Sequence, residues 1–156
     1  MTSLSAAAIE LLVRDGRTFE VRLTGTSMGR TIPDGSLVRV EPVAFHDVRR
    51  GDVIAFRDGD RVVAHRARFR ARGHVIALGD GYALPDLPIP AAAILGRITA
   101  WNDGSEWRAI GPRRNATILG ALFVVAISIA LLFSPWLARK IAGLGVRWRR
   151  SGLRWR

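Results

Sequence analysis

The chain has 156 residues, no cysteine and a formal net charge of +11. Without cysteine it has neither disulfides nor thiolate chemistry. Its three histidines (His46, His65 and His74) lack metal-motif spacing, so neither a metal nor another cofactor is expected. Residues 1–115 carry 17 arginines and 13 acidic residues, whereas residues 139–156 carry seven basic residues and no acidic one. Because the excess charge lies mostly in a short tail, a nucleic-acid partner is not expected.

The first elements in chain order are a short helix and a series of short strands. Residues 4–13 form an amphipathic segment that is too short to span a membrane, and Gly16 ends it. After it, alternating apolar and polar residues with frequent turns predict a mainly β domain, a coiled, barrel-like antiparallel sheet. The strands are expected at 19–24, 37–40, 52–56, 61–72, 74–78, 94–101 and 107–110.

The strand expected at 61–72 has the clearest alternation. One face carries Val63, His65, Ala67, Phe69 and Ala71, and the other face carries four arginines. His65 therefore lies on an apolar face. It is either a core histidine or a general base.

Two further polar features lie close to strand ends. Ser27 follows the first strand in the glycine-rich segment G-T-S-M-G, where a nucleophile can be presented beside free backbone N–H groups; an ordinary polar turn is the alternative. Asp80 and Asp86 follow the strand at 74–78, and each is either a turn residue or a carboxylate that orients His65. Together with His65 they supply nucleophile, base and orienter in that chain order.

The last part of the chain predicts a membrane anchor. Residues 116–138 contain no charged side chain, and at 1.5 Å per residue they would span about 34 Å, slightly more than a hydrocarbon core of about 30 Å. A single transmembrane helix is expected there, with a buried core helix as the alternative. The tail at 139–156, basic and rich in tryptophan, is expected to contact lipid headgroups, unless it is a disordered tail.

Five segments follow one another in an order known from one protein superfamily. They are G-T-S-M-G-R-T-I-P-D-G (25–35), R-R-G-D-V-I-A-F (49–56), V-V-A-H-R (62–66), G-D-G-Y-A-L-P-D (79–86) and I-L-G-R-I (94–98). They resemble the serine box, the Gly-Asp-Val strand, the general-base strand, the later Gly-Asp box and the closing strand of the signal peptidase I superfamily, which includes LexA-type self-cleaving repressors. The resemblance covers roughly residues 19 to 100.

Within that superfamily the general base separates two branches. Bacterial signal peptidases and LexA-type repressors use a serine–lysine dyad, but the single lysine here, Lys140, lies beyond the predicted membrane span. The endoplasmic-reticulum and archaeal type has histidine in the base position and two aspartates six residues apart. The resemblance therefore implies Ser27 as nucleophile, His65 as base, and Asp86 and Asp80 as candidate orienting carboxylates.

The resemblance implies a serine endopeptidase that cleaves precursor or leader peptides after small residues, and the uncharged run at 116–138 adds a membrane anchor. Residues 1–115 would be its catalytic domain. The basic tail favours a cytoplasmic C-terminus, which would place that domain outside the cytoplasm. Gly25, Arg30 and Ser36 depart from the family's serine box, so a catalytically inactive relative that binds a peptide or partner is one alternative. A protein that cleaves itself or one dedicated partner is another.

Overall fold

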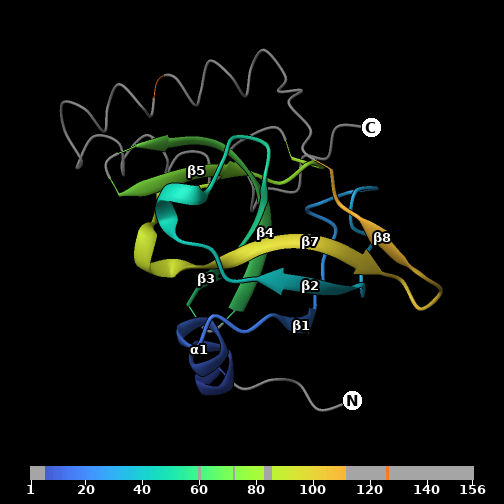
Figure 1. The fold of residues 1–156 in the computed structure, drawn as a ribbon. Coiled ribbons are helices and arrows are strands. Elements are labelled where there is room, and N and C mark those ends of the chain that lie inside the picture. Colours follow the sequence, from blue (N-terminus) through green and yellow to red (C-terminus); the bar gives the residue numbers. More distant parts are fainter. Residues whose placement is uncertain (1–5, 60, 72, 83–85, 112–125, 127–156) are drawn as a thin grey trace.

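The computed structural model describes residues 6–59, 61–71, 73–82, 86–111 and 126. These residues form one short helix, α1 (Ala6–Arg14), and a curled antiparallel sheet of eight strands (Figure 1). The strands are β1 (Phe19–Arg22), β2 (Leu37–Glu41), β3 (Val53–Asp58), β4 (Arg61–Ala71), β5 (His74–Leu78), β6 (Ile89–Pro90), β7 (Ile94–Asn102) and β8 (Trp107–Ala109). The mainly β prediction and the short N-terminal helix are thus confirmed.

The sheet has the strand order β1-β2-β7-β3-β4-β5-β6, with β8 paired to β7. Figure 1 shows how the sheet curls: β4 runs past β7 and bends, so that β5 lies above β2 and β7 in this view. The curl is an open half-barrel. Its central strand, β3, is buried from Val53 to Phe56, because it contributes side chains to apolar clusters on both faces of the sheet.

Strand β4 divides its pairing between two neighbours. It pairs with β3 from Arg61 to Arg66 and with β5 from Arg66 to Ala71. Arg68 is the extra residue of a bulge, since Ala67 pairs with Ala77 and Phe69 with the adjacent Ile76. The bulge reverses the alternation. It explains why Phe69, expected on the apolar face, is 39% exposed.

The divided pairing leaves two strand edges open towards each other. In the described residues, the edge of β4 from Arg61 to His65 that faces away from β3 has no strand partner, and β1 is an edge strand of the sheet. Both segments line the same cavity. Open edges present unpaired backbone N–H and C=O groups to which an extended peptide can bind.

The two-residue strand β6 and the 3-10 turns η1 (Phe45–Asp47) and η2 (Ala91–Ala93) were not expected, because elements this short carry no periodicity. No helix within the described ranges has the length and hydropathy of a membrane span. The predicted span at 116–138 and the tail at 139–156 lie outside the described residues, apart from Ala126.

Candidate active site

Ser27 lies in a tight loop after β1. The strand direction continues to Leu23, whose N–H donates to the Ser36 carbonyl at 2.9 Å, and the Gly25 N–H then donates to the Asp34 carboxylate at 2.7 Å. Gly25 has φ 111°, which favours glycine. Next in the loop, the Met28 side chain is buried in the core and anchors it there, whereas Ser27 is half-buried and lines the cavity.

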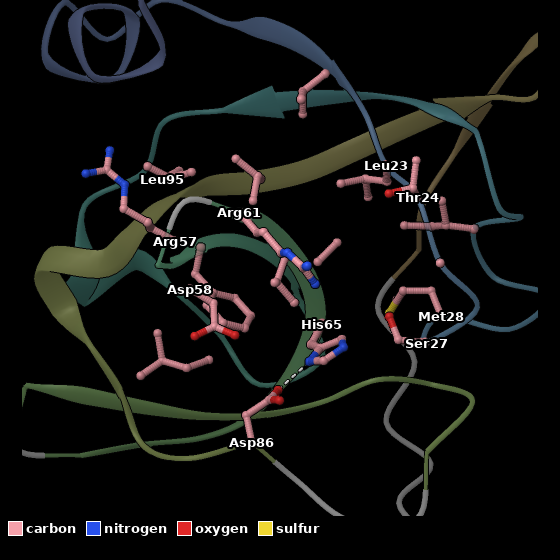
Figure 2. Close-up of a pocket in the computed structure, with 18 of the residues that line it drawn as sticks. Leu23, Thr24, Ser27, Met28, Arg57, Asp58, Arg61, His65, Asp86 and Leu95 are labelled. Atoms are coloured by element: carbon pink, nitrogen blue, oxygen red, sulfur yellow. Dashed lines mark hydrogen bonds and ion pairs between the residues drawn. The ribbon is translucent and has the colours of Figure 1, made fainter. Parts of the chain in front are cut away.

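His65 is buried and bonded to Asp86. Its Nδ1 atom is hydrogen-bonded to Oδ2 of Asp86 (Figure 2). The backbone of Asp86 is fixed in turn, since its N–H donates to the Ala77 carbonyl at 2.8 Å. A carboxylate at Nδ1 favours the tautomer that carries its proton on Nδ1, which leaves Nε2 as the hydrogen-bond acceptor.

The second nitrogen of His65 faces the serine loop. Nε2 is buried and has no hydrogen-bond partner within the part of the chain that the structure describes. The ring packs between Phe56, at 5.9 Å between ring centroids, and Tyr82, at 6.0 Å. In Figure 2 the ring lies between Asp86 and Ser27. An unpartnered acceptor beside a hydroxyl is the arrangement that a general base requires.

A glycine turn holds the serine loop against the histidine. The Gly81 N–H donates to the Ser27 carbonyl at 2.8 Å. A Cβ atom on Gly79 would lie 2.5 Å from the Ser27 carbonyl oxygen and 3.0 Å from Nε2 of His65. Only glycine permits so close an approach, so Gly79 marks the point where the backbone of Ser27 and the ring of His65 meet.

Asp80 lies in the same turn but bonds elsewhere. Its carboxylate accepts hydrogen bonds from Arg66, at 2.6 Å and 2.9 Å, and from the Thr31 hydroxyl at 2.8 Å. Burial favours a raised pKa for Asp80, but the hydrogen bonds from Arg66 and Thr31, with the charges of Arg66 and Arg68, outweigh it and hold the pKa below its usual value. Asp80 therefore links the serine loop, through Thr31, to β4.

Arg66 has a structural role that the sequence did not indicate. It is fully buried, and besides Asp80 it donates to the Gly51 carbonyl at 2.8 Å. In the sequence it is one of four alternating arginines, and such a run usually marks a solvated face. The role of Thr31 could not be predicted either. A single threonine in a loop carries no sequence signal for a hydrogen bond to a residue 49 positions away.

Ser36, one of the residues that differ from the family's serine box, stabilises the turn in which it lies. Ser36 is buried, and its hydroxyl donates to the Pro33 carbonyl at 2.7 Å, which closes the turn after the loop. Arg30 is exposed.

The cavity of about 1180 Å³ beside these residues connects the open strand edges to the site. Its walls include Val21 to Ser27 on one side and Arg61 to His65 on the other. Tyr82 and Leu87 are exposed and also line the cavity, and the ring of Tyr82 contacts that of His65. The cavity is thus a groove that can hold an extended peptide beside Ser27 and His65.

Comparison with known proteins identifies the family. The Peptidase S24-like family matches residues 4–99, which contain all four candidate residues. None of the curated proteins matches the chain. This match supports the resemblance to the superfamily that LexA-type repressors share with signal peptidase I, and it supports a serine-peptidase type of hydrolase. The chain therefore belongs to the Peptidase S24-like family.

Proposed function

We propose that the chain is a membrane-anchored serine endopeptidase in which Ser27 is the nucleophile, His65 the general base and Asp86 the orienting carboxylate. The observation that carries this proposal is the buried bond between His65 and Asp86, with the other ring nitrogen turned to the serine loop. The S24-like family match supports the reaction class. Asp80 holds the loop in place and does not act on the histidine.

The reaction follows from these positions. The Ser27 hydroxyl attacks the peptide carbonyl and passes its proton to Nε2 of His65, while Asp86 stabilises the resulting imidazolium. The tetrahedral intermediate collapses, and His65 gives the proton to the departing amine. Water then attacks the acyl-enzyme, with His65 again taking the proton, and the cleaved carboxylate leaves as Ser27 recovers its hydrogen.

Substrate binding uses the open strand edges. A peptide in extended conformation can pair with β1 on one side and with the start of β4 on the other, and both strands run towards the site. The preference for precursor or leader peptides with a small residue before the cleaved bond rests on the resemblance of the five sequence segments to signal peptidases.

Membrane attachment is part of the proposal. The uncharged run at 116–138 would cross the bilayer once, and the basic tail at 139–156 would contact anionic lipid on the cytoplasmic side. The catalytic domain would then lie outside the cytoplasm. Protease added to sealed vesicles tests this orientation, because it should digest residues 1–115 on one face only and leave the tail intact.

The experiment that tests the catalytic assignment combines cleavage and labelling. Full-length protein is incubated with a serine-directed acylating probe and, separately, with peptides that contain Ala-Ala bonds. We expect modification at Ser27 and cleavage, both lost in Ser27→Ala and both retained in Ser36→Ala. Binding of the peptides without labelling or cleavage would instead support the inactive relative, and equal activity in Ser27→Ala would exclude Ser27 as the nucleophile.

A further inference from the structure

The groove carries charged side chains that the proposed reaction does not use. The titratable side chains that line it are Arg22, Arg57, Asp58, Arg61, His65, Tyr82 and Asp86. Two of its arginines are engaged, since Arg57 forms an ion pair with Glu10 and Arg22 donates to the Gly35 carbonyl. Asp58 and Arg61 remain, and both lie at the β3–β4 hairpin.

Arg61 is directed along the groove. It pairs in register with Asp58 across the hairpin, yet in the described ranges the guanidinium has neither an ion pair nor a hydrogen bond to a side chain. Figure 2 shows the Arg61 side chain extending towards His65, away from Asp58. A guanidinium that is exposed in a peptide groove without a partner is available to a charged ligand.

The strand geometry fixes how far this charge lies from the site. Arg61, Val63 and His65 alternate onto one face of β4, so Arg61 and His65 share that face. At about 3.3 Å per residue, their Cα atoms lie about 13 Å apart, which is about four residues of an extended peptide. The side chain of Arg61 reaches back towards His65 and so comes within range of nearer positions.

We propose that Arg61 forms a substrate subsite for a carboxylate, so that the enzyme prefers peptides with aspartate or glutamate two to four residues from the cleaved bond. This inference rests on the proposed function of Ser27 and His65. A guanidinium binds a carboxylate through two parallel N–H···O bonds, which gives direction as well as attraction. The open edge of β4 binds the peptide backbone, and Arg61 binds the carboxylate of one side chain of that peptide.

Asp58 provides a matched control at the same place. Its carboxylate lies opposite Arg61 in the register and opposes the approach of a second carboxylate. Removing the charge of Asp58 should therefore strengthen the preference for an acidic residue, whereas removing the charge of Arg61 should abolish it. If the net charge of the whole domain caused the preference for acidic peptides, neither of these two substitutions would change that preference by more than any other change of one charge.

The test uses full-length wild-type protein, Arg61→Gln and Asp58→Asn. The probes are capped peptides with one Ala-Ala bond and a single Glu, Gln or Lys placed two, three or four residues to either side. For the wild type we expect kcat/KM for the best Glu peptide to exceed that of its Gln counterpart by about fivefold, a preference that weakens as salt is added. Arg61→Gln should bring this ratio to about one, and Asp58→Asn should raise it.

The outcomes separate this inference from the proposed function. If Ser27-dependent cleavage occurs but Glu and Gln peptides react equally, or if Arg61→Gln keeps the preference, the Arg61 subsite is wrong and the peptidase assignment stands. If no peptide is cleaved, the peptidase assignment fails. Fluorescence anisotropy of the same peptides on Ser27→Ala protein then decides the subsite, because a Glu preference lost with Arg61→Gln supports it and the absence of any preference overturns it.

Discussion

His65 bonds to Asp86, whereas the next residue on the same strand, Arg66, bonds to Asp80. Successive side chains of a strand point to opposite faces, so the two residues face away from each other. The segment after β5 supplies one aspartate to each face. The two carboxylates thus have different partners although they are only six residues apart, and different effects are expected when each is replaced.

Asp86→Asn is expected to reduce turnover by about 10³-fold to 10⁴-fold, because an amide does not hold the imidazole tautomer or stabilise the imidazolium. The free energy of unfolding should change by about 1 kcal/mol or less. Asp80→Asn should instead destabilise the protein by about 3 kcal/mol, since the buried Arg66 loses its counter-charge. Turnover and urea denaturation of both variants are the measurements. A catalytically dead but stable Asp80→Asn variant would mean that the orienting carboxylate is Asp80.

The lowered pKa of Asp80 leads to an expected pH dependence of the free energy of unfolding. Its pKa in the folded protein lies below the ordinary value of 3.8, because Arg66 and Thr31 stabilise the carboxylate more than burial destabilises it. Its contribution is therefore complete above about pH 4 and is lost as the pH falls through the lower folded value. The stability difference between wild type and Asp80→Asn should be constant from pH 7 to about pH 4.5 and should shrink below that. A difference that stays constant down to pH 2 would contradict the assignment.

Two serines in one loop form a matched pair. Ser27→Ala should abolish peptide cleavage with little change in melting temperature, because Ser27 lies at the groove surface. Ser36→Ala should keep the activity but lose about 1 kcal/mol of stability, since its buried hydroxyl bonds to the Pro33 carbonyl. Melting curves and cleavage rates for the pair distinguish a nucleophile from a turn residue. Cleavage that survives Ser27→Ala would refute the proposed mechanism.

Gly79→Ala should disrupt the site, because the added Cβ would lie 2.5 Å from the Ser27 carbonyl oxygen and 3.0 Å from Nε2 of His65. The serine loop or the histidine must move, and we expect a loss of activity of at least about 10²-fold, as small displacements of catalytic groups cause. Gly111→Ala is the control, since no atom of the described residues lies within 4 Å of its added Cβ. Wild-type activity in Gly79→Ala would show that the contact does not position Ser27.

His65→Lys is expected to be as inactive as His65→Ala. The Asp86 carboxylate would stabilise the ammonium form of the lysine and raise its pKa, so that no base is available near neutral pH. In the double variant His65→Lys/Asp86→Asn, burial without the carboxylate would lower the lysine pKa and restore at least about tenfold over the single variant. Rates between pH 7 and pH 10 test this. Equal rates for the two variants would show that Asp86 does not control the protonation of the base.

The strands could be predicted from the sequence because their signals are local. Alternation marked β4 over almost its full length, and Asp58-Gly59 indicated the hairpin before it. The bulge at Arg68 could not be predicted, since the extra residue is defined by its register against β5. The burial of Arg66 depends on Asp80 and the Gly51 carbonyl, which only the folded chain brings together. The resemblance to the superfamily indicated Asp86 as a candidate partner of His65. The separation of the two residues along the sequence did not indicate it.

The bonds that tie the serine loop to the rest of the site all join distant parts of the chain. Thr31 meets Asp80 across 49 positions, and Ser27 meets Gly81 across a similar separation. Contacts of this kind form late, after loop closure has been completed. A nascent or partly unfolded chain would therefore hold a serine and a histidine that do not meet. Hydrolytic competence would then appear and vanish together with global folding, and a denaturant titration followed by activity should coincide with one followed by fluorescence.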